Sequence, residues 1–256
     1  MLTLAAITSM LFNVLWAALR VAGVIMIAPL LGAMFVPNHL RILLIFALAV
    51  AMLPAIGAVP SVSPLSLQGL LTIVRELAIG IALGFALKLA MEAAVLAGQL
   101  VSSGTGLSFA QVVDPQAGGI PLLGRFYLVI ATLLMLVFNA HLQLIEVLAR
   151  SFTLLPIGAD SLQAAQARQL VEFAGLMFSG ALKLALPSVV AILMVNIAFG
   201  VISRAAPTLN LFAVGIPFTL LMGFLIMLLT MDSHGAIWRA QFAETFVFLD
   251  RLLGGS

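Results

Sequence analysis

The residues of this chain best suited to metal binding or proton transfer are three histidines, His39, His141 and His234. They lie far apart, without the close spacing of a metal-binding helix. The chain has no cysteine, which excludes disulfides, thiolate metal sites and cysteine nucleophiles. Its serines lie outside any GxSxG context, and there is no glycine-rich phosphate loop. The sequence therefore predicts a protein that is not an enzyme and that uses no metal or other cofactor.

Charged residues within one long apolar block raise a second chemical question. They are Arg75, Glu76, Lys88 and Glu92, and each would be costly if it faced lipid. Lys88 and Glu92 are four residues apart and can pair along a helix. Arg75 and Glu76 are adjacent and point in different directions, so we expect each to find another partner. Two interpretations stay open, because such charges can fix the register of packed helices or line a wet transport path.

The composition indicates a lipid or protein environment for much of the surface. Hydrophobic residues make up 64% of the chain and charged residues 8%, whereas soluble domains average roughly 25% charged residues. We therefore predict an all-α integral membrane protein with about six hydrophobic helical segments, some of them kinked or hairpin-like, and a C-terminal amphipathic helix. The net charge of +2 comes from few residues, and no basic tract suggests nucleic acid. Arginines are spread over loops of both parities, so the sequence predicts no membrane orientation.

Six apolar blocks are each long enough to cross a bilayer as a helix, which takes about 20 residues. They span residues 10–36, 42–59, 70–101, 121–149, 170–201 and 208–231. Clusters of proline, glycine and serine separate them, as expected of turns. The first residues lack a basic stretch and continue into the first block, so we expect no cleaved signal. Residues 1–256 are predicted to form a single membrane domain.

The segment 75–102 carries small residues in rows at four-residue spacing. One row consists of Ala78, Ala82, Ala86, Ala90, Ala94, Gly98 and Ser102, and a second of Glu76, Gly80, Gly84, Lys88 and Glu92. Small rows let helix backbones approach closely in apolar surroundings. A period above 3.6 residues favours right-handed winding of partners. We expect this helix to be wrapped tightly by neighbours; the alternative is an alanine-rich helix in an ordinary bundle.

The last helical pattern, at residues 236–253, is amphipathic. Its large apolar residues recur at helical spacing, at Trp238, Phe242, Phe246, Leu249 and Leu253. Such a helix suits a membrane interface or a partner surface. We favour the membrane interface, and we also expect His39 and His234, near block ends, to be interfacial.

Two segments interrupt the apolar pattern. The loop "SSGTGLSFAQVVDPQAGGIP" (102–121) is too polar and glycine-rich to continue a helix, yet it holds Phe109, Val112 and Val113. This apolar cluster must be buried, either as a pore constriction that excludes water or tucked into its own bundle. The stretch "RAAPTLNLFAVGIPF" (204–218) has the breaks of a carrier's substrate site, but no second, matching break supports a carrier.

Together these motifs make the chain resemble the FliR-type family of type III export-gate proteins. The family's pattern of a basic residue, Pro, Asn, an aromatic and Gly-x-Pro is present at Arg204, Pro207, Asn210, Phe212, Gly215 and Pro217. The Arg75-Glu76 pair, followed by Gly80 and Gly84, is similar to a second signature. The segment "GLSFAQVVDP" (106–115) resembles the family's plug loop, which here comprises Phe109, Ala110, Gln111, Val112, Val113, Asp114 and Pro115. The resemblance covers essentially the whole chain.

The resemblance implies a fold like a FliP-like and a FliQ-like part fused. It also implies one copy beside several copies of FliP and FliQ, in a right-handed helical gate for unfolded flagellar subunits. FlhB would wrap this gate and FlhA would lie below it. The location would be the inner membrane within the flagellar basal body, with much of the gate on the periplasmic side. A virulence injectisome subunit and, more distantly, a stand-alone small-molecule carrier stay as alternatives.

On this interpretation the small and charged residues pack against other subunits. The expected assembly residues are Arg75, Glu76, Gly80, Gly84, Lys88, Glu92 and the six motif residues from Arg204 to Pro217. In particular, we expect Arg75 and Glu76 to pair with charged or backbone groups of partner chains.

Overall fold

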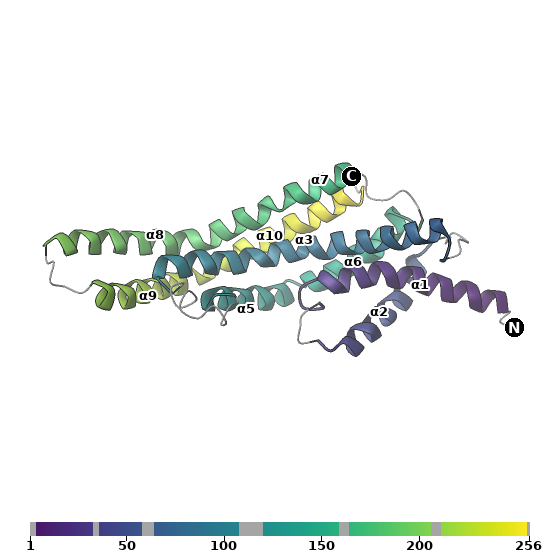
Figure 1. Ribbon diagram of the computed structural model, residues 1–256, viewed down its shortest axis with the longest axis horizontal. Coiled ribbons are helices and arrows are strands. Elements are labelled where there is room, and N and C mark those ends of the chain that lie inside the picture. Colours follow the sequence, from purple (N-terminus) through teal and green to yellow (C-terminus); the bar gives the residue numbers. More distant parts are fainter. Residues whose placement is uncertain are drawn as a thin grey trace. The chain divides into compact units, whose positions relative to one another are not determined.

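The computed structural model describes residues 4–32, 36–57, 64–107, 120–158, 164–205 and 211–254. Every regular element in these ranges is helical (Figure 1). The helices are α1 Leu4–Ile27, α2 Asn38–Met52, the short 3-10 helix η1 Leu53–Ala55, α3 Leu67–Thr105, α5 Leu122–Val137, α6 Ala140–Leu154, α7 Ala164–Phe173, α8 Gly175–Ala205, α9 Leu211–Leu229 and α10 Met231–Leu252. The predicted all-α fold is confirmed.

The described helices include four that are long and apolar enough to cross a membrane, within α1, α2–η1, α3 and α7–α8. Two further pairs are bent, α5–α6 by 62° and α9–α10 by 64°. If each bent pair counts as one span, the described residues contain up to six. The six predicted apolar blocks therefore correspond to real helical segments.

The bend between α5 and α6 lies at a residue that the sequence pattern does not mark. Asn139 has φ 55°, a left-handed conformation, and is the residue before α6. Asparagine adopts this conformation more readily than most residues. The predicted block 121–149 therefore contains two helices joined at a single asparagine, in agreement with the prediction that some segments are kinked or hairpin-like. By contrast, Pro187 and Pro217 lie inside α8 and α9 without ending them.

Helix α3 continues further than predicted. The loop was expected to begin at residue 102, but α3 ends at Thr105, so this boundary is wrong. The Ser103 hydroxyl donates to the Gln99 carbonyl at 2.9 Å, and the Thr105 hydroxyl to the Ser102 carbonyl at 3.1 Å. Serine and threonine remain compatible with a helix when their hydroxyls bond back to its own carbonyls.

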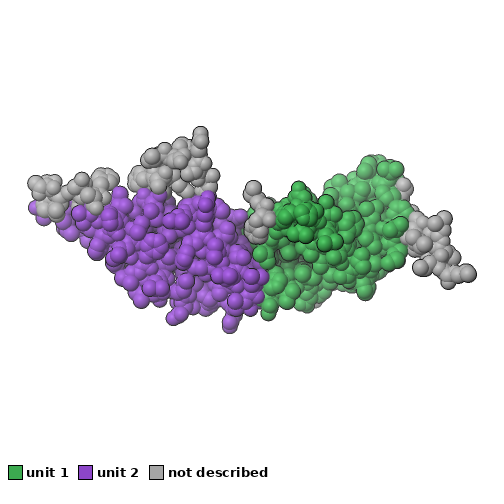
Figure 2. All heavy atoms as spheres, turned by 90° about the horizontal axis from the view of Figure 1, so that it is seen from below, with its two compact units in different colours: residues 1–89, 139–174, 242–256 green, residues 90–138, 175–241 purple. Residues whose placement is uncertain are grey.

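The chain forms two compact units, coloured separately in Figure 2. The first comprises residues 1–89, 139–174 and 242–256, and the second residues 90–138 and 175–241. In the first unit, the Phe173 and Phe248 rings stack with centroids 3.9 Å apart. In the second, Gln241 of α10 donates to the Ala90 carbonyl of α3 at 3.1 Å. Helices α3 and α10 contribute to both units, and the single membrane domain stays a prediction.

The apolar face of α10 lies inside the protein. Trp238, Phe242, Phe246, Leu249 and Leu253 are all buried, so the predicted amphipathic helix is confirmed. Its placement at a membrane interface is wrong, because helices of the same chain already cover this face. His234 of α10 is also buried, with 2% of its surface exposed, and its interfacial position stays a prediction.

Other apolar faces have no cover within the chain. Of the apolar window in α2–η1 only 11% is buried, and of that in α7–α8 only 17%. Large residues of α8 point outward, including Leu182, Leu193 and Val201. Exposed apolar area of this extent indicates contact with lipid or with other proteins.

Candidate functional site

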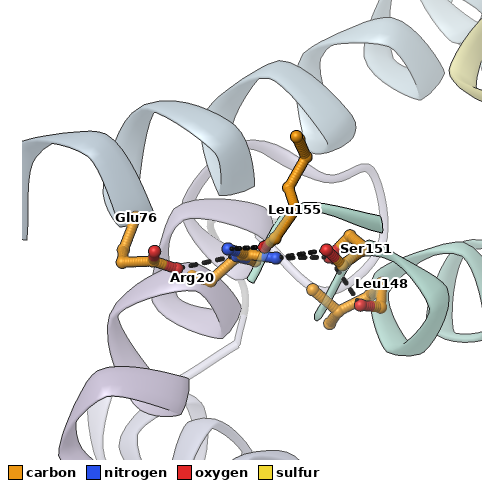
Figure 3. A network of polar contacts seen from close by, with 5 residues as sticks. All are labelled: Arg20, Glu76, Leu148, Ser151 and Leu155. Carbon is orange, nitrogen blue, oxygen red and sulfur yellow. Dashed lines mark hydrogen bonds and ion pairs between the residues drawn. The ribbon is translucent and has the colours of Figure 1, made fainter. Parts of the chain in front are cut away.

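A buried ion pair lies within the first unit (Figure 3). Arg20 of α1 donates from Nε to Oε2 of Glu76 in α3 over 2.8 Å. The two side chains are only 0% and 2% exposed. An unpaired charge at such depth would be strongly unfavourable. Each side chain therefore neutralises the charge of the other, which allows both to lie buried in apolar helices.

Arg20 also binds the C-terminal end of α6. Nη1 donates to the Ser151 carbonyl at 2.7 Å and to its hydroxyl at 3.1 Å, and Nη2 donates to the Leu155 carbonyl at 2.8 Å. The guanidinium carbon lies 4.4 Å from the centre of the Phe152 ring, within reach of a cation–π contact. A cation at a helix C-terminus is favoured by the exposed carbonyls and the helix dipole. Arg20 therefore links α1, α3 and α6.

Glu76 has a second contact, with the turn that follows α6. It accepts a hydrogen bond from the backbone of Gly158. Gly158 has φ 81°, a left-handed conformation in which glycine has no side-chain clash. The carboxylate thus holds this turn beside α3 while it neutralises Arg20.

Glycines bring α1 and α3 close enough for this pair to form. A Cβ added at Gly23 would lie 2.6 Å from the Leu77 carbonyl oxygen, and one at Gly84 would lie 2.8 Å from that of Val24. A Cβ at Gly80 would overlap the Arg20 carbonyl itself. Such close backbone approach is the purpose of small residues at helix crossings in apolar surroundings. The tight packing expected of this segment is present, and it occurs within one chain.

The four charges expected to contact other subunits have different environments. For Glu76 the expectation of a partner-chain group is wrong, because Arg20 and Gly158 satisfy it within the chain. Arg75 is half-buried, Lys88 is exposed and Glu92 is half-buried. The ion pairs of the described residues do not include one between Lys88 and Glu92. The roles of Arg75, Lys88 and Glu92 in assembly stay predictions.

A second close crossing lies in the second unit, where a Cβ added at Gly98 of α3 would overlap the backbone of Gly124 in α5. Further along α3, the Thr219 hydroxyl of α9 lies 3.4 Å from the Thr105 carbonyl. A Cβ at Gly223 would meet the Thr105 methyl group at 3.0 Å. Thr219 and Gly223 of α9 therefore pack on the C-terminal end of α3.

An open cavity of about 460 Å³ adjoins this contact. Its lining comes from the end of α3, from α8 and from α9, and consists of Ser103, Gly104, Thr105, Gly106, Asn196, Phe199, Gly200, Gly215, Ile216 and Thr219. The Asn196 amide lies 3.5 Å from the Gly104 carbonyl. Four of these lining residues are glycines.

The motif at 204–218 is only partly described. Arg204 is exposed in the last turn of α8, where a cation suits the helix dipole. Pro207 and Asn210 lie outside the described residues, and Phe212 lies in the first turn of α9. Gly215 has no described atom within 4 Å of an added Cβ, and Pro217 is exposed. The predicted packing against other subunits is therefore untested at all six positions.

The predicted plug also lies outside the described residues. This applies to Phe109, Ala110, Gln111, Val112, Val113, Asp114 and Pro115.

Sequence reasoning missed the most connected side chain of the site. Arg20 is the lone charged residue in the apolar block 10–36, and that isolation was the available signal, because a charge inside an apolar helix requires a partner. The carbonyls of Ser151 and Leu155 could not be found in the same way. They depend on where α6 ends in space.

Among the described residues, no group of three or more histidine, aspartate or glutamate side chains could hold a metal ion. The Arg20–Glu76 network can hold helices in position. Separately, α2 and α8 expose apolar surface.

Comparison with known proteins gives consistent matches along the chain. The profile of a family described as "Bacterial export proteins, family 1" matches residues 11–245. The chain is 36% identical to the flagellar biosynthetic protein FliR of Escherichia coli (strain K12) over 235 residues, which cover 91% of this chain and 90% of the relative. It is 33% identical to FliR of Pectobacterium carotovorum subsp. carotovorum, with 93% and 91% covered, and 29% identical to FliR of Aquifex aeolicus (strain VF5), with 88% and 90% covered.

Proposed function

The chain belongs to the bacterial export proteins of family 1, as a FliR-type subunit of the flagellar export apparatus, and we propose that it forms the export gate together with FliP and FliQ. The family match over residues 11–245 carries this proposal. The names of the relatives favour the flagellar branch over a virulence injectisome. The gate would be a conduit for unfolded flagellar subunits across the inner membrane, with FlhB and FlhA as further partners.

The exposed surface supports this function. Helices α2 and α8 leave most of their apolar residues uncovered, and the lining of the cavity between α3, α8 and α9 includes four glycines. Neighbouring subunits would cover these faces, and much of the gate would then be held by protein contacts on the periplasmic side of the bilayer. In a stand-alone carrier, lipid alone would have to cover the apolar faces of α2 and α8 and the cavity.

The gate acts without covalent chemistry. A conduit for unfolded chains must accept many sequences and yet exclude water and ions when it is empty. An apolar constriction does both, because it dewets at rest and makes no specific bonds with a passing chain. We assign this constriction to residues 106–115, with Phe109, Val112 and Val113 as its apolar contacts.

Deleting residues 106–115 is the experiment that tests the gate function. Removal of the constriction lets the pore stay wet, so we expect a higher ion conductance of the assembled gate in planar bilayers and altered export in cells. The matched control replaces Ala110, Gln111 and Asp114 by glycine, which keeps the three apolar residues. Unchanged conductance together with unchanged export in the deletion variant would contradict the assignment.

Gly215 tests the predicted packing of the 204–218 motif against other subunits separately from the fold. An added side chain at Gly215 meets no described atom of its own chain within 4 Å. We therefore expect Gly215→Leu to leave the thermal unfolding midpoint of the isolated chain unchanged, and to reduce recovery of the complex with FliP and FliQ several-fold. Gly57→Leu is the control, because a Cβ there is equally free and lies outside the motif. Full recovery of the complex with Gly215→Leu would rule out packing of this motif against other subunits.

A further inference from the structure

Three buried polar side chains meet in the second unit. Tyr127 of α5, Ser188 of α8 and His234 of α10 are 1%, 0% and 2% exposed. The Tyr127 and His234 rings lie with centroids 5.6 Å apart and planes inclined by 48°. The Tyr127 hydroxyl faces Ser188, and the His234 ring faces the backbone of Leu184. Three helices thus direct polar groups to one place in an otherwise apolar core.

These groups lack direct hydrogen bonds of proper geometry. Within the described residues, no partner satisfies the Tyr127 hydroxyl, the Ser188 hydroxyl or either ring nitrogen of His234. Native proteins rarely leave buried polar atoms without a hydrogen bond, because such an atom loses its hydration and no new hydrogen bond offsets that cost in free energy. Three such side chains from three helices indicate a shared partner that is not itself a side chain.

We propose that Tyr127, Ser188 and His234 form a binding site for a buried water molecule. Buried waters make about three hydrogen bonds to otherwise unsatisfied groups, and three side chains converge here. Both hydroxyls can donate or accept, and a neutral imidazole offers one donor and one acceptor. One water can therefore satisfy all three. The site suits a metal ion poorly, because histidine is its single strong metal ligand.

This water links α5, α8 and α10 within the second unit. Apolar burial contributes little to the attraction between helices in lipid, so polar links gain importance there. The site lies on α5 and on the first turn of α10, each of which belongs to a bent pair. The water would thereby hold α5 and α10 in place, and both helices belong to pairs that are bent at a break in the chain.

Radical labelling by X-rays detects the water directly. A short X-ray pulse converts bound water into hydroxyl radicals in place, and Tyr127 is the sole tyrosine of the chain, so its oxidation is unambiguous by mass spectrometry. The sample is the full chain co-purified with its partners, and each rate is divided by that in the unfolded chain. We expect normalised oxidation of Tyr127 well above that of buried Phe152, which is 1% exposed. Equal normalised rates would overturn the proposal.

Removing one hydroxyl tests the same site through stability. Ser188→Ala deletes a partner of the water, so we expect the thermal unfolding midpoint to fall by about 2–4 °C and the oxidation of Tyr127 to decrease. Thr132→Val is the control on α5, since the Thr132 hydroxyl bonds the Leu128 carbonyl of its own helix at 2.8 Å. A dry site predicts an unchanged or higher midpoint for Ser188→Ala, because an unsatisfied hydroxyl is lost. A direct Tyr127–Ser188 bond predicts a lower midpoint with unchanged, low oxidation, and either result would overturn the proposal.

Discussion

Replacing Glu76 by methionine should destabilise the chain by about 3–5 kcal/mol, because it leaves the buried Arg20 charge without its counterion. Arg20→Met should cost a similar amount, since it leaves the Glu76 carboxylate and the carbonyls of Ser151 and Leu155 without their donor. The measurement is the unfolding free energy of the purified chain in mild detergent, followed by tryptophan fluorescence.

The double variant distinguishes a pair from two independent effects. Arg20→Met/Glu76→Met removes both charges and fills the space with apolar side chains, so most of the lost stability should return. Recovery should be incomplete, because two carbonyls at the end of α6 still lack the donors that Arg20 supplied. The control is the exposed pair Arg168–Glu172, with side chains 82% and 63% exposed. Its methionine variants should change stability little, since exposed pairs contribute little. Additive losses in the buried pair would contradict the network.

Replacing Gly80 by leucine should have the second-largest effect. Its Cβ would overlap the Arg20 carbonyl oxygen in α1, so α1 and α3 must separate, and the ion pair between them must lengthen. Overpacking of a tight contact costs typically 1–3 kcal/mol. We expect at least this loss at Gly80, because the obstructing atoms belong to the backbone and have little freedom to move. The readout is the same unfolding transition, together with the yield of monodisperse protein.

Gly200→Leu is the matched control for Gly80→Leu. Both glycines lie inside helices, but no described atom lies within 4 Å of an added Cβ at Gly200. Leucine favours the helix over glycine by close to 1 kcal/mol, so stability at Gly200 should stay equal or rise. If Gly80→Leu also retained full stability, that result would contradict the close approach of α1 and α3 at Gly80.

The helices themselves follow from the pattern of apolar residues. The six apolar blocks and the amphipathic pattern ending at Leu253 each correspond to helical segments, because helix periodicity depends only on neighbours in sequence. The position of the bend at Asn139 was missed because one polar residue in an apolar run carries almost no signal, although its conformation decides the direction of α6.

The site was predictable only in part. Gly80, Gly84 and Glu76 were identified as packing residues from their spacing, and they do lie at a close helix crossing. The sequence analysis expected these residues to contact another subunit, whereas they contact α1 of the same chain. The sequence does not indicate which face of α3 meets α1. The same ambiguity placed the apolar face of α10, including Trp238, at a membrane interface when it is buried in the protein. Which surfaces meet is decided by tertiary packing, which spacing along one helix does not encode.

The most direct test of the export-gate account is the composition of the complex that this chain forms. The chain would carry an affinity tag and be expressed with the FliP and FliQ proteins of its own organism, extracted in mild detergent and weighed by native mass spectrometry. The account predicts one stable hetero-oligomer that contains a single copy of this chain with several copies of FliP and FliQ. A monodisperse chain that retains neither protein and transports small solutes in liposomes would contradict it.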